Sequence, residues 1–517
     1  MSATSGLPLS LLSRHPVGML AVMRLAELAA GVPGAVVEAG GDAEITAIAY
    51  DSRKAGPGTL FVAVEGIKVD GHSFAAEVAA RGAALAVQRT VRVPENTPLV
   101  RMASTRTGLA ELAATFHARP ARKLRVVGVT GTDGKTTTTH MAAHVLETCG
   151  IASGALSTVS FKAGAETTFN ETGQTTIESL ELQAWLARMV DLGVRDVVVE
   201  TTSHALIQER VAACDFDVAA FTNVGRDHLD YHANWEDYLA AKARLIDACA
   251  GGAPKGIPKT AILNLDDASY EHLLARPIER RLTYSMLHEA DLVALDVHAE
   301  VGSSSYRLIA FGQEATVHLQ LPARFNVYNS LCAAGIALAL GCELEAVAAG
   351  LSSFHGVPGR LERVEGGQPF SVYVDFAHSA GALTSALAEL RSLTAGRLLV
   401  VFGSTGRSDH DRPGMGLAAA AGSDYFIITT DDPVDEDPAE IARQVAEGAH
   451  GMTPGRDYDI VLDRRAAIRQ AMAMAHPGDV ILLAGKGHER TMLTARGKEA
   501  WDEAAEAEAA IREVLGL

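Results

Sequence analysis

Short apolar runs alternate with helical stretches over most of the chain. Each run is rich in Val, Ile, Leu and Phe, ends in turn residues and is followed by a pattern compatible with a helix. The clearest stretches are 124–129, 196–204, 217–224, 260–267, 370–378, 397–404, 424–433 and 479–489. Strands that are buried on both faces give continuous apolar runs, and strand–helix alternation is typical of a parallel sheet. The pattern predicts an α/β protein built on parallel sheets.

Breaks in this pattern predict three domains. Short β-like runs alternate with alanine-rich stretches up to residue 121, and the clear strand–helix alternation begins at 122. The segment "GVPGRLERV", residues 356–364, is interrupted by glycine and proline and is compatible with a hinge. The predicted domains are residues 1–121, 122–357 and 358–517.

Composition narrows the class of protein. The 517 residues are 48% hydrophobic and 21% charged, with a net charge of −18. Such an acidic chain is disfavoured as a general nucleic-acid binder, which needs basic clusters to neutralise phosphates. The five cysteines are scattered without a CxxC pair, so neither a disulfide framework nor a structural zinc site is indicated. No run reads as a signal peptide or a membrane span. We expect a soluble protein of the cytoplasm.

The stretch "VVGVTGTDGKTTTT", residues 126–139, resembles a phosphate-binding loop but departs from the usual G-x-x-x-x-G-K-[ST]. Val129 stands where the first glycine of that pattern is expected, which leaves the shorter G-x-x-G-K-T. A strand precedes the loop and a helical sequence follows it, so backbone N–H groups and a helix N-terminus would face an anion. Lys135 would meet the outer phosphates of a nucleoside triphosphate, and the Thr136 hydroxyl could bind magnesium.

Two further stretches carry candidate metal ligands. Glu200 ends a buried strand, where open α/β sheets present their ligand residues, although a solvated loop glutamate is the simple alternative. The stretch "TNVGRDHLDYH" places His228 and His232 four residues apart, a spacing that also suits zinc. Without a third ligand at suitable spacing, a magnesium role for His228 and a packing role for His232 are preferred.

Lys242 lies in an unusual place. Asn234 is a good N-cap for a helix, and the apolar side chains of that helix form one stripe: Trp235, Tyr238, Leu239, Leu245, Ile246 and Cys249. Lys242 falls at the centre of the stripe. A buried ammonium costs several kcal/mol unless it is paired or neutralised. Either its stem extends past the core to solvent, or Lys242 is a functional lysine near the metal.

Taken together, these motifs resemble the Mur ligase family, most closely its tripeptide synthetases, which add the third residue of the peptidoglycan stem peptide. The resemblance covers nearly the whole chain. The motifs that carry it, in order, are "DSRKAGPGTLFVAVEGIKVDGHSF", "GVTGTDGKTTTT", "QTTIESLELQ", "ETTSHALIQERV", "FTNVGRDHLDYH", "YLAAKARL", "ILNLDD", "RFNVYNSLCA", "VPGRLERV", "VDFAHSAGAL", "RPGMG", "DDPVDEDP" and "GKGHE".

The resemblance implies three domains: an N-terminal domain for a uridine nucleotide, a central ATPase domain and a Rossmann-like C-terminal domain for an amino acid. It implies ATP-dependent activation of a D-glutamyl carboxylate as an acyl phosphate, which the amine of a diamino acid then attacks. The implied substrates are UDP-N-acetylmuramoyl-L-alanyl-D-glutamate, the diamino acid and ATP, with magnesium and a carbamylated lysine as cofactors. No nucleic-acid or membrane partner is expected, and the protein is expected to be a monomer.

Site residues follow from the matching motifs. Those implied to bind ATP are Gly131, Thr132, Asp133, Gly134, Lys135, Thr136, Thr137, Asn326, Asn329 and Arg360. Those implied to bind the UDP-linked substrate are Asp51, Ser52, Arg53, Thr175, Thr176, Thr202, Gln208 and Arg210. The implied metal ligands are Thr136, Glu200, His228 and Lys242 as a carbamate, and Lys135 joins the last three in catalysis. Asp375 and His378 would face the closed active site.

The amino-acid site departs from the family pattern. Its implied residues are Arg412, Asp431, Asp432, Gly485 and Glu489. Members that use meso-diaminopimelate carry D-N-P-R, whose arginine binds the distal carboxylate, whereas this chain has D-D-P-V, with Asp432 and Val434 in place of the asparagine and the arginine. An added carboxylate without that arginine favours L-lysine or L-ornithine. In the alternative, Arg407 or Arg490 replaces the missing arginine and meso-diaminopimelate is used.

Two other readings remain. A folylpolyglutamate-synthase-like ligase would share the ATPase core, but the "DSR…LFVA…DGHSF" block argues against it. A degenerate relative that only binds nucleotide would not need to retain Lys135, Thr136, Glu200, His228 and Lys242 together.

Overall fold

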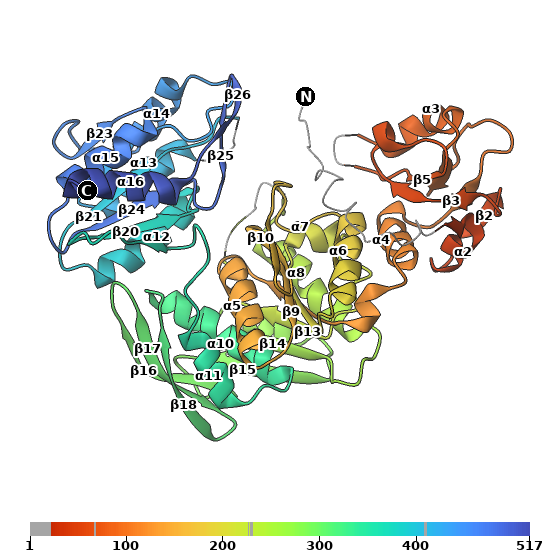
Figure 1. The fold of residues 1–517 in the computed structure, drawn as a ribbon, viewed down its shortest axis with the longest axis horizontal. Coiled ribbons are helices and arrows are strands. Elements are labelled where there is room, and N and C mark those ends of the chain that lie inside the picture. The colour runs from red at the N-terminus through yellow and green to blue at the C-terminus, as the bar shows by residue number, and fades with distance from the viewer. Residues whose placement is uncertain (1–21, 67–68, 226, 228–230, 408–410) are drawn as a thin grey trace. The chain divides into compact units, whose positions relative to one another are not determined.

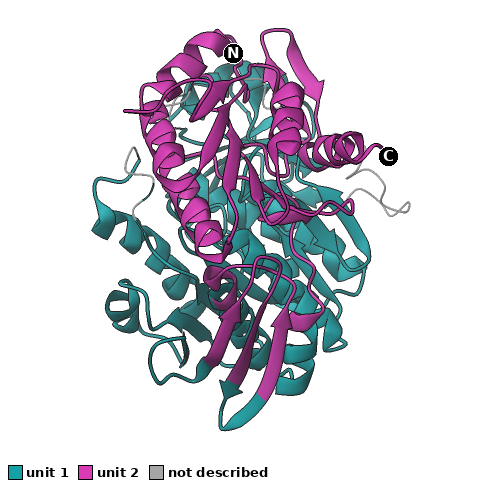
Figure 2. Ribbon diagram, turned by 90° about the vertical axis from the view of Figure 1, so that its left-hand side faces the viewer, with its two compact units in different colours: residues 1–293, 309–314, 328–350 teal, residues 294–308, 315–327, 351–517 magenta. Residues whose placement is uncertain are grey.

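The computed structural model describes residues 22–66, 69–225, 227, 231–407 and 411–517. The contacts divide the chain into two compact units (Figure 2). The first comprises residues up to 293 with 309–314 and 328–350, and the second comprises 294–308, 315–327 and 351–517. The long strands of residues 292–319 and two helices, residues 324–339 and 344–352, therefore contribute residues to both units.

The N-terminal part of the first unit is built on a five-stranded sheet of order β2-β7-β6-β5-β4, which is parallel except for β2. Leu60 and Val62 of β5 belong to one apolar core, and Phe61 between them belongs to another. Both faces of the strand are thus covered, which explains its continuous apolar sequence. The elements are β1 (Met23–Arg24), α2 (Leu25–Ala30), β2 (Val36–Ala39), β3 (Glu44–Ile45), β4 (Ala47–Ala49), η1 (Ser52–Lys54), β5 (Thr59–Val62), η2 (Gly71–Phe74), α3 (Ala75–Ala80), β6 (Ala84–Val87), β7 (Leu99–Arg101) and α4 (Thr105–Phe116).

An eleven-stranded sheet follows, of order β11-β10-β9-β12-β8-β13-β14-β15-β16-β17-β18 (Figure 1). Strands β9, β12, β8, β13, β14 and β15 run parallel, so the ends of β12 and β13 lie on either side of the end of β8. The strands are β8 (Arg125–Thr130), β9 (Ser153–Leu156), β10 (Ser160–Ala163), β11 (Glu166–Phe169), β12 (Asp196–Glu200), β13 (Val218–Phe221), β14 (Thr260–Asn264), β15 (Arg280–Ser285), β16 (Leu292–Ala299), β17 (Ser304–Ala310) and β18 (Gln313–Leu319).

The helices of this region confirm the predicted strand–helix alternation. Asn234 caps α8 as predicted, since its Oδ1 accepts a hydrogen bond of 2.8 Å from the Asp237 N–H. The helices are η3 (Pro120–Lys123), α5 (Lys135–Thr148), α6 (Ser179–Asp191), α7 (Ser203–Ile207), α8 (Trp235–Ala250), α9 (Tyr270–Leu274), α10 (Arg324–Ala339) and α11 (Leu344–Ser352).

The second unit contains a doubly wound sheet of order β19-β20-β24-β21-β22-β23, parallel except for β19. One apolar core joins the sheet to α12, α13 and α14, and another joins its opposite face to α15 and α16. The elements are β19 (Glu362–Val364), β20 (Ser371–Asp375), α12 (Ala380–Leu393), β21 (Leu398–Phe402), α13 (Arg412–Gly422), β22 (Tyr425–Ile428), α14 (Pro438–Ala446), β23 (Tyr458–Ile460), α15 (Arg464–Met474), β24 (Val480–Ala484), β25 (Thr491–Thr494), β26 (Gly497–Ala500) and α16 (Glu503–Leu515).

Candidate active site

The glycine loop joins β8 to α5, as predicted. Gly134 has φ +78° and caps α5, and a Cβ there would lie 2.1 Å from Asn329 Oδ1. A Cβ on Gly131 would lie 1.8 Å from Thr222 Oγ1. The two glycines are therefore required by space as well as by conformation. The first N–H groups of α5 have no partner within the helix, which makes this helix start suitable for an anion.

Two residues after β13 hold the loop and were missed by the sequence reasoning. The N–H of Thr132 donates to the Asn223 carbonyl at 2.8 Å, and the N–H of Asp133 donates to Asn223 Oδ1 at 3.0 Å. The Thr222 hydroxyl donates to the Asp133 carbonyl at 2.6 Å. These bonds fix the first half of the loop in the protein and leave the second half, at the start of α5, for a ligand.

Glu200 lies at the end of β12 and is 1% exposed. Its carboxylate accepts bonds from the Thr136 hydroxyl, at 2.9 and 3.1 Å, and from the Thr158 N–H and hydroxyl, at 2.9 and 3.1 Å. Lys135 directs its ammonium to the Thr132 carbonyl at 2.6 Å. A carboxylate and a hydroxyl side by side are hard oxygen ligands of the kind magnesium prefers, so these residues fit that ion.

Lys242 is 1% exposed, as the stripe on α8 predicted. Its ammonium donates to the Gly131 carbonyl at 2.6 Å and lies 4.3 Å from the centre of the Tyr238 ring. Burial and the nearby Lys135 hold the pKa of Lys242 well below its ordinary value. The reading in which its stem extends to solvent is therefore wrong. His228 lies outside the described residues.

His232 has the surroundings of a packing residue. It is 1% exposed, its Nε2 lies 3.2 Å from the Ser203 hydroxyl, and its ring centre lies 5.0 Å from that of Tyr238. This agrees with the packing role preferred for it.

The residues implied to bind the UDP-linked substrate form two groups. Arg210 donates to the Thr176 carbonyl and to Gln208 Oε1, each at 2.8 Å, and the Thr176 hydroxyl donates to the Glu200 carbonyl at 2.8 Å. Thr202 joins them, because its N–H donates to the Thr176 hydroxyl at 3.1 Å. This group is therefore bonded directly to the metal candidate Glu200.

Thr175 precedes Thr176 and is partly exposed. The second group lies in the N-terminal sheet region, where Asp51 caps η1 and accepts bonds from Arg53, and the Ser52 carbonyl accepts a bond from Arg81.

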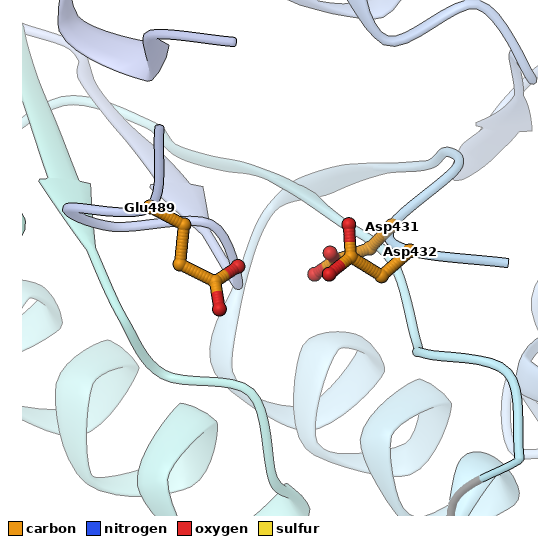
Figure 3. A group of neighbouring side chains, drawn as sticks. All are labelled: Asp431, Asp432 and Glu489. Atoms are coloured by element: carbon orange, nitrogen blue, oxygen red, sulfur yellow. The ribbon is translucent and has the colours of Figure 1, made fainter. Parts of the chain in front are cut away.

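Four of the five amino-acid candidates follow β22 and β24, which lie on either side of β21, and Arg412 begins α13 after β21. The carboxylates of Asp431, Asp432 and Glu489 face one another (Figure 3). Lys486, which the sequence reasoning did not assign, puts its fully buried ammonium 2.7 Å from Asp432 and 2.5 Å from Glu489. Gly485 is required here, since its φ is +108° and a Cβ would lie 2.3 Å from Asp431 Oδ2.

The arginines near this cluster already bind acidic side chains. Arg412 donates to Glu436 at 3.0 Å and to Gln444 at 2.7 Å, so an incoming carboxylate would compete with Glu436. Arg407 is paired with Asp435, and Arg490 with Asp502.

Four further candidates belong to the second unit. The Arg360 guanidinium lies 4.9 Å from the Phe376 ring centre, and His378 Nδ1 lies 2.8 Å from the Phe376 carbonyl. Burial raises the pKa of Asp375, which accepts the N–H groups of Leu361 and Ala377. The Asn326 amide donates to the Pro322 carbonyl at 2.8 Å, whereas Asn329, in the first unit, meets the glycine loop.

A glycine loop at the carboxyl end of a parallel sheet, with a second doubly wound unit that carries its own polar cluster, defines a nucleotide-dependent α/β enzyme. Residues 44–117 match the Mur ligase family catalytic domain, 129–337 the Mur ligase middle domain and 359–487 the Mur ligase glutamate ligase domain. The chain belongs to the Mur ligase family and is thus an ATP-dependent amide ligase of peptidoglycan synthesis. The predicted α/β fold class of this family is confirmed.

Named relatives span nearly the whole chain. It is 42% identical over 486 residues to a UDP-N-acetylmuramyl-tripeptide synthetase of Roseiflexus sp. (strain RS-1), covering 91% of this chain and 95% of the relative. It is 40% identical over 496 residues to a UDP-N-acetylmuramoyl-L-alanyl-D-glutamate–2,6-diaminopimelate ligase of Geobacillus kaustophilus (strain HTA426), covering 95% and 100%.

Solved structures share the fold. A UDP-N-acetylmuramoyl-L-alanyl-D-glutamate–2,6-diaminopimelate ligase matches with a TM-score of 0.68 and 28% identity, over 95% of this chain and 99% of that one. A Mycobacterium tuberculosis folylpolyglutamate synthase, solved with ADP and AMPPCP, matches with a TM-score of 0.58 and 18% identity, over 80% and 95%. The second likeness concerns the fold alone. Within the described residues, no helix combines the length and the apolar character that crossing a membrane requires.

Proposed function

We propose that this ligase joins a diamino acid, L-lysine or L-ornithine in preference to meso-diaminopimelate, to the D-glutamate of UDP-N-acetylmuramoyl-L-alanyl-D-glutamate. The observation that carries the amino-acid preference is the cluster of Asp431, Asp432 and Glu489 around Lys486, with Val434 in the position of the family's arginine. These three carboxylates outnumber the one ammonium of Lys486, and the nearby Arg464 guanidinium is paired with Glu503. The excess of negative charge suits a second ammonium on the substrate.

In the first step, an oxygen of the D-glutamyl carboxylate attacks the γ-phosphorus of ATP, and the bond from that phosphorus to the ADP oxygen breaks. Lys135 and the N–H groups at the start of α5 would bind and neutralise the phosphates. Arg210, with Thr176 and Gln208, would orient the muramoyl-dipeptide, because this group is bonded to the Glu200 backbone beside the loop.

In the second step, the amine of the diamino acid attacks the acyl carbon, the carbon–oxygen bond to phosphate breaks, and the amine loses a proton. Glu489 and the two aspartates would hold the side-chain ammonium of the diamino acid. Arg412 would bind the α-carboxylate after release from Glu436.

Magnesium would be held by Thr136 and Glu200 together with His228 and a carbamate on Lys242, and it supplies positive charge to the phosphates when bound. Carbamate formation joins the neutral Lys242 amine to CO2 and releases one proton. Its support is that burial and nearby Lys135 favour the neutral amine and outweigh Asp227 and Asp133, which favour the charged form. A carbamate anion there would also balance the charge of Lys135.

The carbamate is tested by Lys242→Ala and by removal of bicarbonate. We expect Lys242→Ala to lower kcat by at least about 100-fold, which is the loss typical of removing one group that stabilises charge in the transition state. Removing bicarbonate from the enzyme without substitutions should lower its activity, and adding bicarbonate back should restore it. Lys123→Ala, at an exposed lysine of η3, is the matched control and should stay fully active. A fully active Lys242→Ala enzyme excludes the role.

Amino-acid preference is tested by competition between L-lysine, L-ornithine and meso-diaminopimelate, with the products separated and counted. We expect lysine or ornithine to exceed meso-diaminopimelate in kcat/KM by about tenfold or more, the equivalent of 1.4 kcal/mol. Equal or reversed preference refutes the diamine reading.

A ligase for meso-diaminopimelate is the second candidate, and the name of the Geobacillus kaustophilus relative favours it. It requires another arginine for the distal carboxylate. Arg407 or Arg490 would have to take that role, and each already binds an aspartate. Phosphate release from ATP tests the alternative of a folylpolyglutamate-type activity. In the proposed ligase this release should require both the UDP-linked dipeptide and the amino acid, and release that does not need the dipeptide would refute the proposal.

The domain ranges 1–121, 122–357 and 358–517 belong to the same proposal. The three family matches, 44–117, 129–337 and 359–487, each fall within one of these ranges. We also propose that the enzyme works in the cytoplasm as a monomer, where its nucleotide substrates are found.

A further inference from the structure

Lys486 is a buried ammonium at the centre of the amino-acid cluster. It follows β24 by two residues, is 0% exposed and reaches across to the segment that follows β22. Its Nζ lies 2.7 Å from Asp432 Oδ1, 2.5 Å from Glu489 Oε2 and 3.7 Å from Asp431 Oδ1. Its ammonium thus connects the loops that follow β22 and β24, on either side of β21, and Arg464 binds the same two strand ends through the Thr430 and Ala484 carbonyls.

Charge keeps Lys486 protonated at this position. Burial lowers the pKa of Lys486, but the carboxylates of Asp431, Glu489 and Asp432 outweigh burial and raise it above its ordinary value. The cluster therefore has a resident cation, which distinguishes it from an acidic site open to a divalent metal.

The three carboxylates do not depend on Lys486 equally. Asp432 Oδ1 also accepts the Leu493 N–H at 2.8 Å, so the backbone fixes it as well. Asp431 lies farther from the ammonium and packs against Gly485. The carboxylate of Glu489 is held by Lys486, the one described side chain to which it is bonded, and the Glu489 side chain is 37% exposed.

We propose that Lys486 is a positioning residue for amine recognition: it holds one carboxylate oxygen of Glu489 so that the other faces the side-chain ammonium of the incoming diamino acid. The proposal rests on the proposed function for the role of Glu489. It adds that selectivity for an amine depends on an internal lysine that does not itself touch the substrate. Removing that lysine releases Glu489 into several rotamers and lowers amino-acid affinity without disturbing the phosphate loop.

The first experiment measures steady-state kinetics of the full chain with Lys486→Met and Lys486→Arg. We expect Lys486→Met to raise KM for the preferred amino acid by about tenfold or more, while KM for ATP stays within about twofold. Lys486→Arg keeps the charge and should recover part of the loss. Lys498→Met, at an exposed lysine of β26, is the matched control and should leave both constants unchanged.

Lys486→Met leaves three carboxylates without their cation and could prevent folding. A second variant therefore tests the proposal with a smaller charge imbalance. Lys486→Met/Asp432→Asn removes one charge of each sign, and its melting temperature is compared with that of Asp432→Asn alone. If the single variant does not fold, the double variant should still show the rise in amino-acid KM relative to Asp432→Asn.

A double-mutant cycle with Glu489→Gln identifies the path of the effect. If Lys486 acts through Glu489, the variant Lys486→Met/Glu489→Gln should be no worse in amino-acid KM than Glu489→Gln alone. Fully additive losses, or equal rises in the KM values for ATP and the amino acid, overturn the positioning role. The amino acid that wins the competition assay is used throughout, so an enzyme that prefers meso-diaminopimelate would refute the diamine preference and still test Lys486.

Discussion

At the scale of single residues, buried lysines differ in whether their ammonium binds a carboxylate or a backbone carbonyl. Lys259 and Lys255 bind the fully buried Asp217 at 3.1 and 2.7 Å, a group that holds the start of β13 to neighbouring segments. Lys242 is equally buried, yet its hydrogen bond goes to a backbone carbonyl. The charge of a buried lysine that pairs with a carboxylate is balanced within the protein and needs no functional explanation. The unequal pairing is the reason that Lys242, rather than Lys259, supports a functional proposal.

Glu181 offers a stability prediction at the same scale. It accepts a bond of 3.0 Å from the Tyr50 hydroxyl, while burial, together with nearby Glu178, raises its pKa above 4.5. A raised folded-state pKa means that folding binds a proton, so this group's contribution to stability is present at low pH and is lost as pH rises through the folded pKa. Glu181→Gln removes the group whose ionisation lowers stability at high pH, and its amide oxygen can still accept the hydrogen bond from the Tyr50 hydroxyl.

We expect Glu181→Gln to melt about 2 °C higher than the parent at pH 8 and at the same temperature at pH 4. Thermal unfolding followed by fluorescence across this pH range measures the difference. Glu171→Gln, at an exposed glutamate, is the control and should not change the pH profile. A gain that is equal at both pH values would contradict the explanation.

At the scale of elements, the phosphate loop depends on three adjacent parallel strands. β8 leads into the loop, β12 ends in Glu200, and β13 leads to Thr222 and Asn223, which bind the loop backbone. Parallel strands bring their carboxyl ends to one edge, so residues far apart in sequence meet there. The segment after β13 thus holds the backbone of the shortened glycine loop.

Gly134→Ala tests how closely the end of the loop packs against Asn329 of α10. Gly134 and Gly150 have nearly the same left-handed backbone, with φ +78° and +77°, but only at 134 would a Cβ meet another residue within 4 Å. We expect Gly134→Ala to lower kcat/KM for ATP by about 100-fold, the loss typical of a misplacement near 1 Å. Gly150→Ala has the same conformational cost and should stay within about threefold. Similar losses in the two variants would mean that conformation, and not the contact with Asn329, is responsible.

At the scale of the whole molecule, the proposed reaction would use groups from two compact units. The phosphate loop and Glu200 belong to the first unit, and Asp431, Asp432 and Glu489 belong to the second. The amine and the acyl carbon must approach to about 3–3.5 Å for the bond to form. A change in the arrangement of the units on substrate binding is therefore expected, with hinges predicted near residues 121 and 357.

Closure is measured by small-angle X-ray scattering of the full chain. We expect the UDP-linked dipeptide together with a non-hydrolysable ATP analogue to lower the radius of gyration, and either ligand alone to lower it less. A radius that is unchanged when both ligands are saturating would contradict closure as the step that joins the two sites.

Much of the fold follows from local pattern. The predicted strands, the helix from Lys135 and the helix capped by Asn234 are all found, because strand and helix periodicities depend on neighbouring residues. The burial of Lys242 followed from the same periodicity. The roles of Asn223 and Lys486 could not be predicted from periodicity, although both residues lie in motifs that the sequence analysis identified.

The sequence by itself determined the parallel α/β class, the glycine loop, the family and the inward position of Lys242. Only the tertiary structure decided that Asn223 closes the loop from 90 residues away, and that Lys486 bonds Asp432 across 54 residues. The physical reason is the same in both cases. Spacing along the chain predicts which face of a helix or strand a side chain lies on. The partner of an ion pair or a hydrogen bond, by contrast, comes from a neighbouring strand end, and the order of strands in the sheet decides which strand end that is.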